Sequence, residues 1–305
     1  MSTGCGSAAH GGPVSVHGGH SGQFCSHARD SLARVVAAYA AKRFAWVGLT
    51  EHMPPPDDRF LYPEERRAGL NAAAISQRFA AYMAEARRLQ QRWRKHLTIL
   101  VGFEAEACRG ALALAQQLRA RFSPDYIVGS VHHVADIPFD SSPRHYAQAA
   151  ACCGGLDPLY ERYFDLQWEM LALLRPQVVG HFDLIRLFDP DYPRRLARPT
   201  IMRRIVRNLE TVRRIGALLD FNVAALDKGA REPYVSAPIR HLAREMDIAL
   251  VPGDDSHGAD MVGRHFQKAQ ALLAAEGFRT DWPVPGNSEP RPQALRPPRR
   301  PSIHA

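Results

Sequence analysis

Residues 125–134 read DYIVGSVHHV, a short apolar run that ends at His132 and His133. A run of this length, rich in Val and Ile, is typical of a buried strand in a parallel sheet. Six further apolar runs along the chain also end at histidine, carboxylate or amide side chains. These runs span residues 14–16, 45–49, 97–103, 178–180, 218–221 and 248–251.

Segments with helical spacing of apolar residues separate these runs. The predicted helices cover about residues 31–42, 76–95, 111–121, 157–175, 200–216, 236–246 and 265–276. Alternation of strands and helices predicts an α/β barrel over residues 14–282. Two long connections, 53–65 and 134–156, would leave the face where the strands end. Barrel enzymes carry their chemistry on that face, so either connection could cover a substrate.

The composition is that of an ordinary globular protein, with 305 residues of which 46% are hydrophobic and 23% charged. No apolar stretch reaches the roughly 18 residues of a membrane span. The five cysteines show no disulfide or zinc-finger spacing. We therefore expect a cytoplasmic protein without a membrane partner. Residues 1–13 and 283–305 are predicted to be disordered because of their Gly-rich and Pro/Arg-rich compositions.

The formal net charge of +8 favours anionic ligands. A small-molecule phosphate ester is the partner that we expect. A basic nucleic-acid binder that uses the Arg-rich tail is an alternative. It is disfavoured because basic and aromatic residues are not interleaved as in proteins that stack bases.

The repeated histidines and carboxylates at strand ends predict a metal centre. Because the C-terminal ends of barrel strands open on one face, these side chains would converge there. Burying so many of them is costly unless a cation pairs with them. Imidazole and carboxylate ligands suit Zn, Mn or Fe. Two or three such ions can clamp a phosphate and lower the pKa of water to about 7, which favours phosphoester hydrolysis. A hydrogen-bonded polar layer at the barrel mouth is the alternative.

Nine longer strings carry a family resemblance. They are HSGQFCSHA (20–28), GLTEHMP (48–54), YPEE (62–65), GFEAE (102–106), DYIVGSVHHV (125–134), IPFD (137–140), YFDLQWEML (163–171), VVGHFDLIRLF (178–188) and GDDSH (253–257). Together they resemble the PHP superfamily, and most closely its histidinol-phosphatase branch. The resemblance covers about residues 14–280. It implies a distorted (β/α)7 barrel with a trinuclear metal site that hydrolyses L-histidinol phosphate to L-histidinol and phosphate in histidine biosynthesis.

The same resemblance implies three groups of metal ligands. They are His20, Glu104 and Asp255; His27, His52 and His257; and Glu104, His132 and His181. Glu104, Asp255 and His257 are also the residues expected to carry catalysis. The neighbouring His133 and Asp183 would orient ligands, and Asp254 could be either a ligand or a supporting residue.

The first motif departs from the family, which begins His-x-His, because Gly18 stands at the first ligand position. His17 could take over that role only if the backbone bends, which the Gly18-Gly19 pair permits. Without it the first metal would bind more weakly.

A second departure places Asp227 where the family has an arginine. Arg186 and Lys228 are the predicted contacts to phosphate or substrate, because each closely follows a strand end. Two alternatives to the histidinol-phosphatase prediction stay open. The chain could be another PHP-type phosphoesterase with a different substrate, or a metal-binding relative impaired by the altered first motif.

Overall fold

Seven parallel strands form a nearly closed barrel in the computed structural model, which describes residues 12–286. Their order in the sheet is β1-β2-β3-β4-β7-β8-β9. The strands are β1 Val14–Ser15, β2 Trp46–Leu49, β3 Thr98–Ala105, β4 Tyr126–Gly129, β7 Val178–Val179, β8 Leu218–Asn222 and β9 Leu250–Gly253. Each overlaps one of the seven predicted runs, so the predicted seven-stranded α/β barrel is confirmed.

The barrel closes between its first and last strands through individual backbone hydrogen bonds. The Val16 amide donates to the Pro252 carbonyl at 2.9 Å, and the Asp255 amide donates to the His17 carbonyl at 2.9 Å. The first and last strands, β1 and β9, therefore lie against each other, and each strand leads directly into predicted ligand residues.

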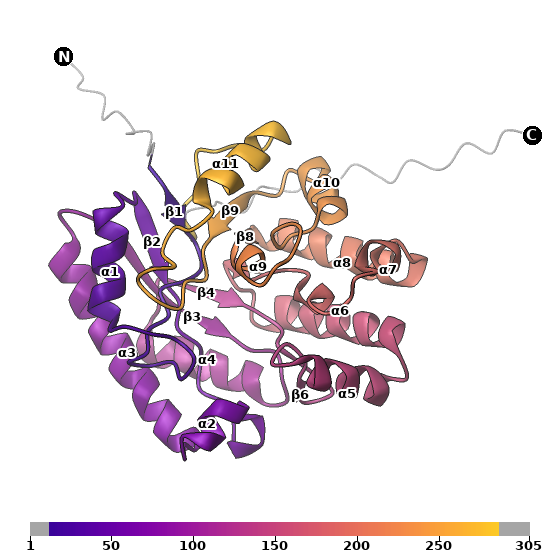
Figure 1. Cartoon of the computed structure of the whole chain (residues 1–305), viewed down its shortest axis with the longest axis horizontal. Coiled ribbons are helices and arrows are strands. Elements are labelled where there is room, and N and C mark those ends of the chain that lie inside the picture. The colour runs from indigo at the N-terminus through magenta and orange to yellow at the C-terminus, as the bar shows by residue number, and fades with distance from the viewer. Residues whose placement is uncertain (1–11, 287–305) are drawn as a thin grey trace, which may run out of the picture.

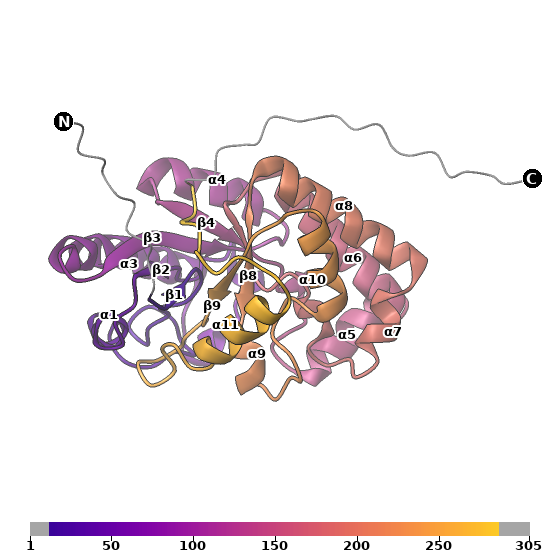
Figure 2. The same cartoon turned by 90° about the horizontal axis from the view of Figure 1, so that it is seen from above.

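Helices surround the strands, with α1 and α3 on one side and α5, α6 and α8 on the other (Figure 1). The view from above shows the strands enclosed by this outer layer (Figure 2). The helices are α1 Leu32–Ala41, α2 Pro63–Arg67, α3 Ala72–Trp93, α4 Ala111–Phe122, α5 Pro143–Cys153, α6 Leu156–Leu173, α7 Tyr192–Leu196, α8 Pro199–Ile215, α9 Ala224–Asp227, α10 Ala237–Glu245 and α11 Phe266–Ala275, with short 3-10 turns η1 Asp58–Phe60 and η2 Leu184–Arg186. All seven predicted helices are present; α2, α5, α7 and α9 were not predicted.

Helix α8 illustrates how the sequence specifies this layer. Ile201, Ile205 and Leu209 are spaced four residues apart and are fully buried, so they form one apolar stripe. Pro199 occupies the first turn, where its missing amide hydrogen is not needed. Gly216 ends the helix in the left-handed conformation that favours glycine.

The connection over residues 134–156 holds more structure than its sequence predicted. It begins with an antiparallel hairpin of β5 His133–Val134 and β6 Ile137–Pro138, and it continues into α5. Ser142 caps α5 by accepting a hydrogen bond from the His145 amide. The connection is thus an ordered hairpin and helix beside the strand ends.

Residues 1–11 and 287–305, which include most of both predicted disordered ends, lie outside the described residues. The first described residues are attached to the barrel, because the Ala45 amide donates to the Pro13 carbonyl at 2.8 Å. Within residues 12–286, none of the helices combines the length and the apolar character required to cross a bilayer.

Candidate metal centre

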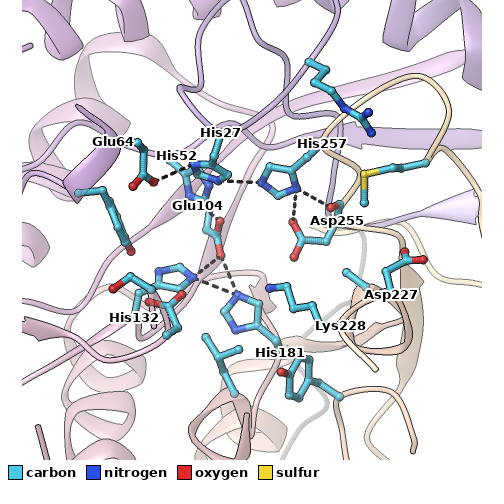
Figure 3. A pocket seen from close by; sticks show the side chains of 18 residues that line it. His27, His52, Glu64, Glu104, His132, His181, Asp227, Lys228, Asp255 and His257 are labelled. Atoms are coloured by element: carbon cyan, nitrogen blue, oxygen red, sulfur yellow. Dashed lines mark hydrogen bonds and ion pairs between the residues drawn. The ribbon is translucent and has the colours of Figure 1, made fainter. Parts of the chain in front are cut away.

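Histidines and carboxylates gather where the barrel strands end. They follow β1 (His17, His20 and His27), β2 (His52), β4 (His132), β7 (His181) and β9 (Asp255 and His257), and Glu104 lies within β3. Most of them line a cavity of about 470 Å³, a size typical of small-molecule sites. Figure 3 shows these side chains pointing toward one another. His17 and His20 are fully buried behind the cavity wall.

Glu104 lies at the centre of this cluster. Its Oε1 is 3.1 Å from His181 Nε2 and 3.4 Å from His132 Nε2, as the dashed lines of Figure 3 indicate. Its Oε2 is 2.9 Å from His52 Nδ1 and 3.4 Å from His17 Nε2. Ligands of a tetrahedral metal with bonds of about 2.1 Å lie roughly 3.4 Å apart, so these separations match a shared metal. The predicted group of Glu104, His132 and His181 therefore comes together.

The predicted group of His27, His52 and His257 also comes together, and Cys25 joins it. The Nε2 atoms of His27 and His257 are 3.0 Å apart, and Cys25 Sγ is 3.3 Å from His27 Nδ1. The sequence had indicated no cysteine ligand. Burial, followed by the charge of Glu51, raises the pKa of the Cys25 thiol well above its ordinary value, so the thiol is protonated without a cation nearby.

The remaining predicted group, His20, Glu104 and Asp255, is divided differently in the structure. His20 and Glu104 gather with His17, whereas His20 and Asp255 gather with His257. His20 Nε2 is 3.2 Å from Asp255 Oδ1. His17 thus supplies a side chain that links Glu104 to His20.

The backbone bend at Gly18-Gly19 brings His17 into the cluster. Gly18 has φ +153° and Gly19 has φ +75°, both in the region that favours glycine. A Cβ atom on Gly18 would lie 2.4 Å from Asp254 Oδ1, so this path of the chain excludes a side chain there. The bend that the sequence permits is therefore present, and His17 is fully buried with its imidazole beside Glu104.

Three histidines of the cluster are held from behind by carboxylates. Their Nδ1 atoms lie 2.8–3.0 Å from these oxygens, in the pairs His17–Asp220, His20–Glu51 and His132–Glu106. A carboxylate accepts a hydrogen bond from Nδ1, which leaves the Nε2 lone pair directed at the centre. This supporting role was not predicted from the sequence for any of the three carboxylates.

The inward nitrogens lack the partner that such a lone pair requires. Nε2 of His17, His20 and His52 is buried and makes no hydrogen bond of acceptable geometry. Carboxylate oxygens face the first two, and a lone pair facing an anion is unfavourable without a cation between them. The donor set and its unpaired atoms therefore fit divalent metal ions.

Electrostatics give the same result. Burial opposes the charged form of His20, but Asp255 and Glu51 outweigh burial and raise its pKa to about 9. Burial would likewise raise the pKa of Glu104, but His17, His132 and His52 hold it well below its ordinary value. The cluster is therefore strongly attractive to positive charge, whether protons or metal ions.

Three neighbouring residues lie outside these ligand groups within the described chain. Asp254 accepts hydrogen bonds from Ser15, Tyr39 and the Gly263 amide. His133 lies 3.1 Å from Glu106 and therefore supports the wall. Asp183 pairs with Arg186.

Arg186, which the sequence predicted to contact phosphate or substrate, does not line the cavity. Its side chain is only 4% exposed, with Nε 3.1 Å from Asp183 Oδ2. Nη2 donates to the carbonyls of Glu232 and Pro233 at 3.0 and 2.7 Å. The guanidinium is committed to these internal partners because the chain turns inward at η2.

Lys228, by contrast, lines the cavity and points toward the cluster (Figure 3). Arg29 lines it too. Arg29 pairs with Asp260 at 3.1 Å, and Asp227 pairs with Arg264 at 3.0 Å and lies 3.1 Å from His265. Lys228 therefore keeps positive charge beside the ligand groups, which suits an anionic ligand.

The fold and the cluster define an α/β barrel with a polynuclear metal-type site at the strand ends. The PHP domain model matches residues 18–224. The chain belongs to the PHP domain family.

Two curated relatives and one solved structure are similar over most of the chain. The chain is 35% identical over 265 residues to the probable histidinol-phosphatase of Schizosaccharomyces pombe, covering 86% of each. It is 30% identical over 291 residues to the histidinol-phosphatase of Saccharomyces cerevisiae, covering 84% of this chain and 87% of that one. The histidinol phosphate phosphatase of Lactococcus lactis, solved with zinc, L-histidinol and phosphate, superposes with a TM-score of 0.65 at 19% identity, covering 88% of this chain and 94% of the other.

Proposed function

We propose that this protein is a metal-dependent phosphomonoesterase that hydrolyses L-histidinol phosphate to L-histidinol and phosphate, a reaction of histidine biosynthesis. The observation that carries the proposal is the convergence of ten potential ligand side chains beside a cavity that Lys228 also lines. The substrate is proposed because the curated relatives at 35% and 30% identity are a probable histidinol-phosphatase and a histidinol-phosphatase.

Two to three divalent ions, Zn, Mn or Fe, would occupy the site. His17, His20, Glu104 and Asp255 would hold one; His27, His52 and His257, with Cys25 adjacent, a second; and Glu104, His132 and His181 a third. Ions at these positions would act as Lewis acids toward a phosphate ester and would lower the pKa of water.

The chain's own groups would divide the remaining work. Glu104, Asp255 and His257 line the cavity as well as joining the ligand groups, so they are the side chains we expect to contact the reacting atoms. Lys228 would neutralise phosphoryl charge, because it lines the same cavity. The carboxylates behind the histidines would keep each imidazole in one orientation.

Two alternatives involve the same site but differ in its substrate or in whether it is catalytically active. Another phosphate ester would suit Lys228 and the ligand groups equally well, and only the substrate test separates these cases. An impaired metal-binding relative is disfavoured, because His17 reaches the cluster through the bend at Gly18. A cytoplasmic location and a small-molecule substrate, without nucleic-acid or membrane partners, belong to the same proposal.

The deciding experiment measures phosphate release and bound metal on one sample. Purified protein would be assayed with L-histidinol phosphate before chelation, after chelation, and after addition of Zn²⁺ or Mn²⁺. We expect two to three metals per chain and activity that disappears and returns with them. Full metal occupancy without phosphate release from L-histidinol phosphate would overturn the substrate, and a protein that binds no metal would overturn the site.

A matched pair of variants separates the site from the rest of the surface. His132→Gln should lower metal content and activity together, because it removes a ligand beside Glu104. His241→Gln is the control, since this exposed histidine contacts only Arg244 and Glu245 on α10 among the described residues. Equal losses in both variants would contradict the assignment.

A further inference from the structure

Asp140 is a carboxylate on the cavity wall that has no partner. Its side chain lines the cavity. Within residues 12–286 it makes neither a hydrogen bond nor an ion pair, and its Oδ1 is buried without any hydrogen-bond partner. It belongs to the string IPFD (137–140), and no residue of this string has a role in the proposed reaction.

The backbone holds Asp140 firmly in this position. The preceding residue, Phe139, is fully buried and packs edge-on against Tyr163, with ring centroids 5.7 Å apart. Its amide donates to the carbonyl of His132 at 3.1 Å, which ties the segment to a predicted metal ligand. Two residues later Ser142 caps α5. The residues before and after Asp140 therefore fix its position beside the site.

The other carboxylates of the cavity wall are all paired. Asp227 has Arg264, Glu64 lies 3.5 Å from His27, and Glu104 and Asp255 face the histidines of the cluster. Asp140 is also absent from every potential metal group found among the described residues. A half-buried carboxylate without a partner is costly, so this position favours a cation that arrives from outside.

The hydroxyl of Tyr234 supports this interpretation. It lines the same cavity and is buried without a hydrogen-bond partner. Tyr62 lines the cavity as well, and burial, followed by the charge of Asp140, raises its pKa well above the ordinary value. Both tyrosines line the cavity that Asp140 lines, and a tyrosine hydroxyl can donate a hydrogen bond to a polar group of a ligand or accept one from it.

We propose that Asp140 binds the ammonium group of the substrate and thereby selects phosphate esters of amino alcohols over other phosphate esters. The proposal rests on the proposed function. The wall then matches a substrate with opposite charges at its two ends, because Lys228 is available for the phosphate and Asp140 for the amine. Imidazole, with an ordinary pKa of about 6.5, is mostly neutral above pH 7, so the amine is the cation to recognise.

The test compares Asp140→Asn with wild type on three esters at pH 7.5. These are L-histidinol phosphate, its desamino analogue 3-(imidazol-4-yl)propyl phosphate, and p-nitrophenyl phosphate. We expect the KM for L-histidinol phosphate to rise roughly tenfold or more, because a charge partner is lost. The kinetic constants for the two esters without an amine should not change.

Asp136→Asn is the matched control. Asp136 lies in the same hairpin, between β5 and β6, but it pairs with the exposed Arg109 at 2.7 Å and does not line the cavity. This variant should behave as wild type with all three esters. Thermal melting would verify folding, and Asp140 makes no hydrogen bond whose loss would unfold the protein.

Each other result overturns the proposal. An equal loss for L-histidinol phosphate and its desamino analogue would assign Asp140 to the imidazole instead. An equal loss for all three esters would place it in the reaction itself, and unchanged constants would leave it without a role in binding.

An inhibition assay keeps this test independent of the proposed function. L-Histidinol should inhibit p-nitrophenyl phosphate hydrolysis, with an inhibition constant that rises in Asp140→Asn. If wild type does not cleave L-histidinol phosphate but this inhibition behaves as expected, the proposed reaction fails and the amine site stands. If cleavage is normal and the inhibition constant does not change, the amine site fails alone.

Discussion

Replacing Asp220 by asparagine tests the idea that carboxylates behind the cluster set its metal affinity. Asp220 is fully buried in β8. Its Oδ2 lies 2.8 Å from His17 Nδ1, 3.0 Å from Asn222 Nδ2 and 3.3 Å from the His181 amide. Asparagine keeps the shape and one acceptor oxygen, but it removes the charge on which the histidine contact depends.

The expected magnitude follows from these contacts. Hydrogen bonds to a charged acceptor are about twice as strong as neutral ones, so the Asp220–His17 contact weakens most. The new amide group would occupy the Oδ1 position, where the structure provides no hydrogen-bond partner. Loss of such a supporting partner typically lowers metal affinity about 10- to 100-fold. This corresponds to roughly 1.4–2.7 kcal/mol in binding free energy.

The assay is a zinc titration in competition with a chromophoric chelator, with bound metal counted on the same protein. Asp220→Asn should lose affinity at one site while the others stay close to wild type. Asp136→Asn serves as the surface control, and melting in excess chelator shows whether the metal-free variants are folded. Unchanged zinc affinity in folded Asp220→Asn would refute the argument that Asp220 orients His17.

Three further predictions concern the same region. Gly18→Ala should lower the free energy of unfolding by about 1–3 kcal/mol in denaturant titrations, because Cβ would lie 2.4 Å from Asp254 and φ is +153°; stability equal to wild type would show that the bend is not required. Arg186→Met should lower the free energy of unfolding by about 3–5 kcal/mol, because Asp183 would stay buried without this partner. The KM for the substrate should not change. A raised KM at normal stability would instead support a contact between Arg186 and the phosphate. Zinc added to metal-free protein at pH 7 in weak buffer should release protons, because His20 has a raised pKa of about 9 and is protonated below it. Zinc affinity should accordingly fall as the pH falls, and binding without proton release would contradict this.

Much of the barrel could be predicted from the sequence because its strands are buried on both faces. Apolar runs such as 126–131 therefore have no polar alternation, and each one ends where a side chain can reach the open face. Position at the strand ends predicted that these side chains converge, and the family resemblance implied the particular group of His132, His181 and Glu104. The glycine pair at 18–19 similarly indicated where the backbone could bend.

The supporting residues were harder to predict because their partners are distant in sequence. Glu106 lies two residues after Glu104, a spacing that places both on one side of a strand, and this signal could have been used. Asp220 interrupts an apolar strand, which also signals a buried partner. The internal partners of Arg186 could not be predicted, because proximity to a strand end does not reveal whether a side chain turns inward. Asp183 and the carbonyl of Pro233, which hold Arg186, cannot be identified from spacing.

The closure of the barrel between β1 and β9 has a consequence for how the protein acquires its site. Ser15 and Asp254, 239 residues apart, are joined by a hydrogen bond beside this seam. Contacts between such distant parts of a chain form late, because a long loop must close first. His17 and His20 are synthesised early, but their ligand groups are complete only after Asp255 and His257 have been synthesised and folded against them. Metal bound across the seam would then favour the closed form by mass action. Chelation should therefore loosen β1 and β9 at this seam before it disturbs the helices, and hydrogen exchange would show this order.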